Sequence, residues 1–405
     1  MTDQLNKIKF FMYFKTIIGM EIFLAPFLYI FYNSYCNITL NNFILIESIF
    51  FLAILILEIP MGYISDVLGR KKSFIFGNTL SAISLMVPIF FPNTAGFIFS
   101  LTIKAIGGSI ASGILSSILY ELYLENNKIT DYRKLMSNLA VLGLISSSVA
   151  ALISGLVIKY SIIIPIILDA SLTTLASIFG LFLIQVQKNK NSNLITIKDR
   201  FKIQFIDLTN TFPLYKKNFL LIVILSLIFA LVRSSYSFYQ PIFLHYKLST
   251  TTIAVLFAAF NIVSSSAAYI SKYIFISNNI LKFFPIILIF ISFSGLLILV
   301  NNIYFIISGI FIQQIYRGLY TSENSYIINS SITEKTKSRV TYLSISSALN
   351  LLLTSLFLGI LNFLSNVIPF NIILSILSFF IGALIIIYIT KLRKEKNYAQ
   401  NKIFT

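Results

Sequence analysis

The sequence predicts an all-α, polytopic membrane protein of about twelve transmembrane helices. Apolar runs of about 20 residues recur from end to end, and each is long enough to cross a bilayer core of ~30 Å as a helix. Only 11% of the 405 residues are charged, whereas a typical soluble domain has about 25%. Hydrophobic residues make up 57% of the chain. Together these observations predict a membrane protein that crosses the bilayer several times.

The apolar runs divide into two sets of six. Short polar connections, such as Pro92-Asn93-Thr94 and Asn301-Asn302, are typical of tight antiparallel turns at a membrane surface. The first run is too long for the apolar region of a signal peptide and lacks a small-residue cleavage site, so we expect it to be a span. The predicted helices lie near 9–32, 42–62, 73–91, 96–122, 135–158 and 161–186, then 219–244, 250–271, 282–300, 303–328, 340–364 and 369–391.

The basic residues predict the orientation in the membrane. If the N-terminus is cytoplasmic, almost every loop Lys and Arg falls on the inner side, and the outer loops keep only Lys159 and Lys247. Cytoplasmic loops carry such an excess of positive charge. We therefore expect both termini inside and an even number of spans. The Ile, Asn, Lys and Phe bias is typical of an AT-rich bacterial genome, which predicts the bacterial inner membrane.

The longest polar segment, 187–218, divides the chain into halves at 1–186 and 219–405. Its apolar positions favour a short helix at the membrane surface, although a solvated linker fits equally well. The halves share a short internal repeat. Gly62-Tyr63-Ile64-Ser65-Asp66 and Ala268-Tyr269-Ile270-Ser271-Lys272 both follow the second helix of their half.

The most informative stretch lies between the second and third predicted helices. It reads Glu58-Ile59-Pro60-Met61-Gly62, then an aspartate at 66, a glycine at 69 and three basic residues from Arg70. The glycines permit a turn that other residues would strain. The aspartate can accept hydrogen bonds from free N–H groups at a helix start. The basic triplet would keep this loop on the cytoplasmic side.

The spacing G-x-x-x-D-x-x-G-R-K-K resembles the signature loop between helices 2 and 3 of the major facilitator superfamily of secondary transporters. The preceding Glu-x-Pro-x-Gly resembles a variant found in bacterial drug-efflux-like members. Weaker similarities lie at Ser112–Leu122, Arg317-Gly318 and Arg339–Ser344. The resemblance implies two six-helix halves that rock around a central site. It also implies an inner gate in which Asp66 engages the start of helix 11, near 339–341, and Arg70 pairs with an acid such as Glu121. The gating residues would be Glu58, Gly62, Asp66, Gly69, Arg70, Lys71 and Glu121.

Two departures from the family pattern weaken an antiporter interpretation. Where helix 4 of the family often has an arginine followed four residues later by glycine, this chain has Lys104, then Gly107 and Gly108. The Gly-Pro of many drug–proton antiporters is missing from helix 5. That helix is instead rich in small residues between Gly143 and Gly155, which permit close helix packing.

Charges at membrane depth are costly and usually functional. The resemblance implies that helices 1, 4, 7 and 10 line the cavity, which makes Glu21, Lys104, Arg233 and Arg317 its candidate charges; interhelical ion pairs are the structural alternative. A lone Glu21 carboxyl in a low-dielectric cavity could carry a proton. A permanent pair with Arg233 is the competing hypothesis. Asp169 is a further candidate, for which a structural role or exposure at the membrane interface is favoured. For Glu323, function and structure are equally favoured. For Tyr236 and Tyr239, core packing is favoured over a place in the substrate cavity.

Several function classes are excluded. The net charge of +17 lies in short loops rather than in one nucleic-acid-binding patch. The chain has one cysteine, Cys36, and one histidine, His245, so we expect no metal site, no cofactor and no enzyme. No GxxxxGK[ST] loop for a nucleotide occurs. We expect a monomeric secondary transporter whose partners are a small molecule, protons and the bilayer. Its expected activity is proton-coupled export of an amphiphilic compound, with proton-coupled uptake of a nutrient, peptide or siderophore as the alternative.

Overall fold

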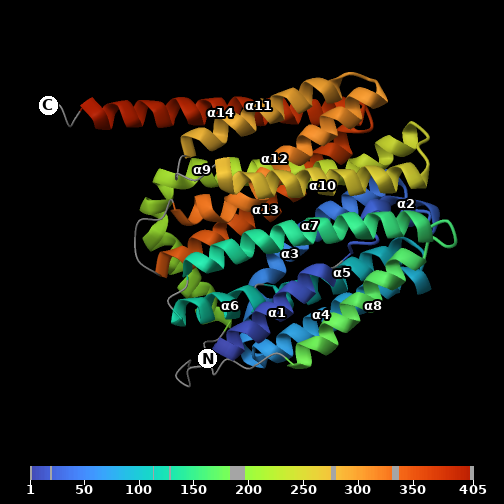
Figure 1. The fold of residues 1–405 in the computed structure, drawn as a ribbon, viewed down its shortest axis with the longest axis horizontal. Helices are drawn as coiled ribbons and strands as arrows, with labels where there is room; N and C mark the ends of the chain where they lie inside the picture. The colour runs from blue at the N-terminus through green and yellow to red at the C-terminus, as the bar shows by residue number, and fades with distance from the viewer. Residues whose placement is uncertain are drawn as a thin grey trace. The chain divides into compact units, whose positions relative to one another are not determined.

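The computed structural model describes residues 2–18, 21–112, 114–126, 129–182, 197–274, 280–330 and 337–401. All regular structure in these ranges is helical, as predicted (Figure 1). In parts of them, notably 197–218 and 337–344, only the backbone is described. The chain forms two compact units. Unit 1 comprises Met1–Ile206 with Phe243–Ser265, and unit 2 comprises Asp207–Ile242 with Ser266–Thr405.

Unit 1 is built around α4, which packs against α5 and α8, while α3 packs on α5 (Figure 1). The α4–α5 crossing is very close, because a Cβ atom added at either Gly77 or Gly107 would lie 2.6 Å from the carbonyl oxygen of the other glycine. The helices of this part of the chain are α1 (Thr2–Ile18), η1 (Ala25–Phe27), α2 (Leu28–Ser34), α3 (Leu40–Leu68), α4 (Arg70–Phe90), α5 (Thr94–Ala111), α6 (Ile114–Glu125), α7 (Ile129–Val157), α8 (Ile164–Phe179) and η2 (Gly180–Phe182).

The small residues of α7 do permit close packing, as their composition predicted. The first part of α10 (Thr250–Ile274) lies against α7 within unit 1. A Cβ atom at Gly155 would come within 2.3 Å of the Ala254 Cβ, and the Ser148 hydroxyl donates to the Ala258 carbonyl at 2.9 Å. These contacts need small side chains on both helices.

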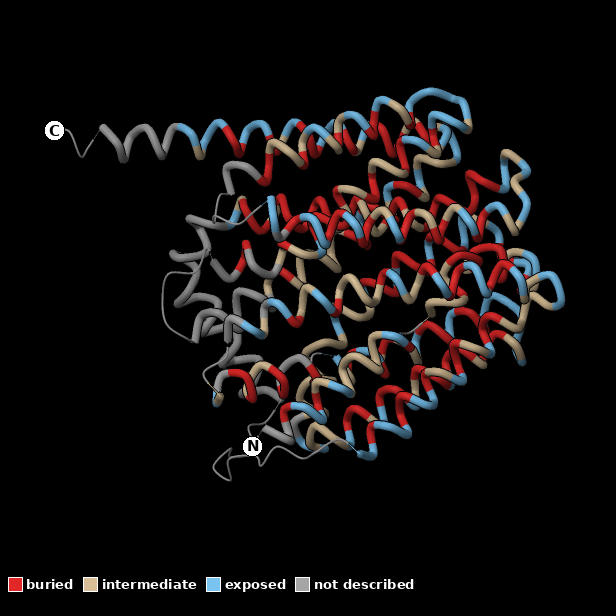
Figure 2. The backbone as a smooth tube through the Cα atoms, viewed as in Figure 1, coloured by how far each residue is buried: buried red, intermediate tan, exposed pale blue. Residues whose placement is uncertain are grey.

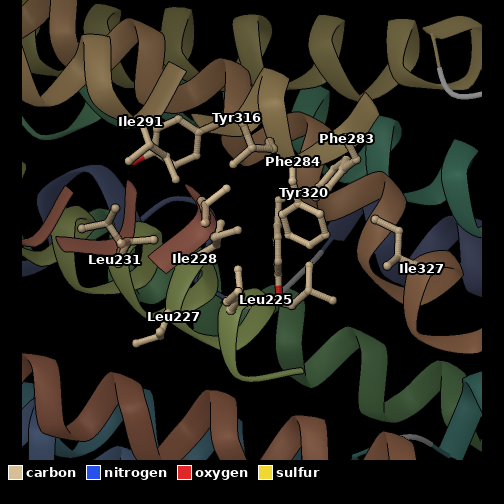
Figure 3. Close-up of a cluster of buried hydrophobic side chains, with 14 of the residues drawn as sticks. Leu225, Leu227, Ile228, Leu231, Phe283, Phe284, Ile291, Tyr316, Tyr320 and Ile327 are labelled. Atoms are coloured by element: carbon tan, nitrogen blue, oxygen red, sulfur yellow. The ribbon is translucent and has the colours of Figure 1, made fainter. Parts of the chain in front are cut away.

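Unit 2 holds most of α9 (Ile197–His245) together with α11 (Ile280–Leu299), α12 (Ile303–Ser330), α13 (Lys337–Leu364) and α14 (Phe370–Asn401). Its apolar core forms where α9, α11 and α12 meet. Figure 3 shows Leu225 and Ile228 of α9 beside Phe284 of α11 and Tyr320 of α12. This core holds in place the helices that carry the polar side chains described below.

Nine of the described helices are long and apolar enough to cross a membrane. A shorter apolar helix, Phe283–Leu299, corresponds to the ninth predicted span. The other two predicted spans are the interrupted first one and α12, which carries several polar residues. Buried and exposed positions alternate along the helices, and many large apolar side chains are exposed, as lipid contact requires (Figure 2).

The predicted loop at 62–72 was too long. Helix α3 continues through Gly62 and Asp66 to Leu68, and α4 begins at Arg70, so Gly69 alone separates them. Gly69 has φ +82°, a conformation that only glycine adopts without strain. One of the two predicted turn glycines therefore makes the turn. Gly62 is helical, because the helical hydrogen bonds persist to the end of α3.

Three other boundaries differ from prediction. The first span is not a single helix over 9–32: α1 ends at Ile18, and helical structure resumes at η1. The fourth span is divided into α5 and α6. Of the predicted linker 187–218, residues 187–196 lie outside the described residues, and from Ile197 the backbone is helical and continuous with the seventh span. The predicted division at 186 and 219 remains a prediction.

Candidate functional site

The break in the first span places Glu21 against Lys104 of α5. The lysine Nζ donates to a carboxylate oxygen of Glu21. The Glu21 side chain is 19% exposed and the Lys104 side chain is 17% exposed, so water screens this ion pair only weakly. The Lys104 ammonium also lies over the Phe50 ring, 5.3 Å from its centroid. The prediction of a lone Glu21 carboxyl was therefore wrong. Its partner is Lys104 of the same unit.

The backbone at Glu21 is unusual. Glu21 has φ +57°, the left-handed region that non-glycine residues rarely occupy. Such a residue costs about 1–3 kcal/mol and persists only where its surroundings hold it. Its carbonyl accepts the Ala25 N–H at 3.0 Å. Glu21 thus belongs to a bend in the backbone rather than to a regular helix. The direction of its side chain depends on the contacts that hold this bend.

Asp169 of α8 fixes this bend. Its carboxylate is 0% exposed and accepts the N–H of Phe23 at 3.2 Å and the N–H of Leu24 at 2.7 Å. Helix starts leave such N–H groups without helical partners, and a carboxylate satisfies two at once. The structural role favoured from sequence is thus visible as direct contacts. The missed signal was Pro26, since a proline inside a helical run ends or kinks the helix just before it.

The predicted contact between Arg70 and Glu121 is present. The Arg70 guanidinium donates two parallel hydrogen bonds, each 2.6 Å long, to the two oxygens of the Glu121 carboxylate. This pair joins the start of α4 to α6. The Arg70 side chain is 41% exposed and the Glu121 side chain is 40% exposed, so water can reach this ion pair. Ser73 also donates to the Ser65 carbonyl at 3.0 Å, which ties α4 back to α3 across Gly69.

The remaining gate residues are placed less completely. Asp66 lies in the last turn of α3, but its side chain and those of 339–341 lie outside the described residues. The predicted Asp66 contact with helix 11 therefore stays a prediction. Glu58 and Lys71 are partly buried, on α3 and on the first turn of α4.

Unit 2 brings together Arg317, Tyr236 and Tyr239. The Arg317 guanidinium lies 5.7 Å from the centroid of the Tyr236 ring and donates to Gln314 Oε1 at 2.9 Å. Gln314 Nε2 donates to the Tyr239 hydroxyl at 3.3 Å, and that hydroxyl donates to Gln313 Oε1 at 2.5 Å. Tyr239 is 1% exposed, so it is a core residue, as favoured from sequence, yet it is also hydrogen-bonded.

Sequence reasoning missed Gln313 and Gln314. Two adjacent amides in the apolar run 303–328 were the available signal, because buried amides demand partners. Arg233 lies on α9, one turn before Ser237, whose hydroxyl is 3.5 Å from its guanidinium. This contact is at the outer limit for a hydrogen bond.

Glu323 lies on the same helix as Arg317, towards its C-terminal end. Its carboxylate is 4% exposed and accepts the Ser271 hydroxyl at 3.0 Å. Ser271 also lies 2.7 Å from the Ser322 hydroxyl. Ser271 belongs to the second copy of the internal repeat, so this contact anchors the end of α10 to α12.

Across the part of the chain that the structure describes, no group of three or more His, Cys, Asp or Glu could hold a metal ion.

Comparison with known proteins identifies the class to which this fold and these charged helices belong. The family model of the Major Facilitator Superfamily matches residues 10–341. No match was found among curated protein sequences. The chain belongs to the major facilitator superfamily, and it is a secondary transporter of small molecules that spans a membrane several times.

Solved structures share the fold at low sequence identity. The nucleoside transporter NupG is 12% identical, with a TM-score of 0.67 over 96% of this chain and 98% of that one. A POT family transporter in complex with a thioalcohol-conjugated peptide is 16% identical, with a TM-score of 0.71 over 96% of each chain. The human organic anion transporter MFSD10 (TETRAN) is 12% identical, with a TM-score of 0.69 over 94% and 99%. At these identities the likeness concerns the fold.

Proposed function

We propose that this protein is a proton-coupled transporter of the bacterial inner membrane that exports a small amphiphilic compound. One observation carries the coupling role: the carboxylate of Glu21, at a bend in the first span, is neutralised by Lys104 alone among the contacts described for it. Both side chains are largely shielded from water, so the attraction between their charges is screened only weakly.

The pair gives protonation a direct mechanical consequence. A proton on Glu21 removes the negative charge, and the Lys104 ammonium then loses its partner in a low-dielectric site. An unpaired buried charge costs several kcal/mol, so the lysine must find another acceptor or the helices must move. Proton binding would therefore weaken the link between the bend and α5, and proton release would restore it.

Asp169 supports the pair from the other side. By accepting the N–H groups of Phe23 and Leu24, it holds the bend against α8 while Glu21 reaches α5. The bend can thus be released from α5 and still keep its anchor on α8. The bend is thus held by one contact through its backbone and one through the Glu21 side chain, to two different helices, which suits a hinge.

The inner gate lies at Gly69 and the Arg70–Glu121 pair. A bidentate pair fixes direction as well as distance. We propose that it forms on the cytoplasmic side while the outer side is open, with Asp66 closing the same gate. Both termini would be cytoplasmic, and the protein would act as a monomer.

Export is favoured over uptake by the Glu58-Ile59-Pro60-Met61-Gly62 run, which resembles drug-efflux-like members. The test is transport of a fluorescent amphiphilic panel into everted membrane vesicles from cells that express the protein. Export predicts accumulation inside everted vesicles that requires an acidic interior and stops with a protonophore. Accumulation in right-side-out vesicles alone would show uptake, and protonophore-insensitive transport would remove proton coupling.

A further inference from the structure

A chain of hydrogen bonds joins Arg317, Gln314, Tyr239 and Gln313 in unit 2. Arginine cannot accept a hydrogen bond, so the Gln314 amide turns its oxygen towards Arg317. The Gln314 nitrogen donates to the Tyr239 hydroxyl, and that hydroxyl donates to the Gln313 oxygen. The charge on Arg317 therefore fixes the orientation of the Gln314 amide at the start of this chain.

This arrangement leaves the network short of acceptors. The Gln314, Tyr239 and Gln313 oxygens each receive one of these bonds. At the far end, Gln313 Nε2 is a buried donor with no hydrogen-bond partner among the described residues, on a side chain that is 1% exposed. A buried amide donor left unsatisfied is destabilising. An acceptor that reaches this group would remove that destabilisation.

The same face of α9 carries positive charge and aromatic surface. Tyr236 and Ser237 lie three and four positions after Arg233, and Gln240 lies four and three positions after them, which places all four on one side of the helix. Tyr236 also lies under the Arg317 guanidinium. The combination therefore offers two cations, an aromatic face and a surplus of donors at membrane depth.

We propose that this network, defined by Arg317, Tyr236, Tyr239, Gln313 and Gln314, binds the substrate, and that the substrate is an organic anion with a carboxylate and a flat apolar part. A guanidinium binds a carboxylate through two parallel bonds, which a neutral or cationic compound cannot provide. The aromatic rings accept the apolar part. This proposal rests on the proposed function, because it assigns the chemical class of the transported compound.

Ligand binding is best measured first without transport. Purified protein in lipid nanodiscs is heated with aromatic and aliphatic carboxylates, and with the methyl ester and the amine of the same skeleton for each. A bound ligand raises the unfolding midpoint in proportion to its affinity. We expect stabilisation by carboxylates, starting with 3-phenylpropanoate and indole-3-acetate, and not by their esters or amines.

Three variants separate recognition from folding. Arg317→Lys keeps the positive charge but removes the planar guanidinium that can donate two parallel hydrogen bonds. It should weaken carboxylate binding about tenfold or more. Gln313→Glu places an acceptor inside the network and should abolish the carboxylate response while the protein still unfolds cooperatively. Ser308→Ala, an exposed position elsewhere on α12, should match the wild type. A carboxylate response unchanged in both Arg317→Lys and Gln313→Glu would overturn the proposed site.

Proton flux distinguishes this proposal from the proposed function. In proteoliposomes with an internal pH dye, each carboxylate and its matched ester and amine are added to one side. Proton movement started by carboxylates alone supports both proposals. Movement started by amines or esters keeps proton-coupled transport and overturns the anionic substrate. Stabilisation by carboxylates without proton movement keeps the anion site and overturns the coupling. No stabilisation by any carboxylate overturns the substrate class.

Discussion

Lys104 of α5 forms an ion pair with Glu21, and Glu21 lies at a bend with φ +57° that Asp169 of α8 holds by two backbone hydrogen bonds. Three charged side chains from three predicted spans thus meet at the bend in the first span. Each of them was a candidate from sequence alone. Glu21 and Lys104 form the ion pair, Asp169 holds the backbone, and the proposed function gives Glu21 the role of proton carrier.

Asp169→Ala should strongly destabilise the protein. The substitution leaves the buried Leu24 N–H without its acceptor, at about 1–3 kcal/mol, and the partly buried Phe23 N–H at a smaller cost. Asp169→Asn keeps one acceptor oxygen and should lose about half as much. The measurement is the unfolding midpoint in detergent, with Ser171→Ala, at an exposed position on the same helix, as control. Equal stability of Asp169→Ala and the wild type would show that the bend does not need this anchor.

Exchanging Arg70 and Glu121 should test the inner gate. Because both side chains are about 40% exposed, at 41% and 40%, breaking their pair should cost only about 1 kcal/mol or less of stability. Transport by Arg70→Glu should nevertheless fall severalfold, because the two residues would repel each other. The double change with Glu121→Arg should restore much of it. Full transport by the single variant would remove this pair from the mechanism.

Asp66→Asn should leave folding intact and strongly slow transport. The family resemblance implies that this carboxylate engages the start of helix 11, and the amide keeps the shape while it removes the charge. Initial transport rates and the unfolding midpoint are compared in the same preparation. A variant that transports at the wild-type rate would show that the aspartate is not part of the gate.

The orientation in the membrane should follow the basic residues. Reporter fusions at 200 and 400 should report the cytoplasm, whereas fusions near 37 and 302 should report the outside. Because loops of one side share their excess of Lys and Arg, the four results are expected together. One reporter on the opposite side would break the count of twelve spans.

Much of the fold could be predicted from sequence because membrane spans are long, apolar and bounded by polar turns. The family could be predicted from the loop at 62–72, although the loop itself proved to be one glycine between two helices. Helix boundaries inside a span were harder. The bend at Glu21 interrupts an apolar run, so hydropathy does not reveal it, and the local indications are the helix-disfavouring residues Gly19 and Pro26.

Most residues of the candidate site could be predicted from the sequence, but only some of the contacts between them could. The Arg70–Glu121 pair followed from the resemblance. The Glu21–Lys104 pair did not, because two residues 83 positions apart meet only when α5 is packed beside the bend. The hydrogen bonds of Gln313 and Gln314 could not be predicted, because the spacing of residues along the chain does not show which side chains meet in the fold.

Proton movement through Glu21→Gln tests the coupling role most directly. Wild type, Glu21→Gln and Glu125→Gln, which removes an exposed acid on α6, are placed in proteoliposomes that contain a pH dye. Because glutamine mimics the protonated carboxyl, substrate counterflow should persist in Glu21→Gln, while proton movement and gradient-driven transport fall to the level of empty liposomes. Glu125→Gln should match the wild type. Proton-coupled transport at the wild-type rate by Glu21→Gln would contradict the account.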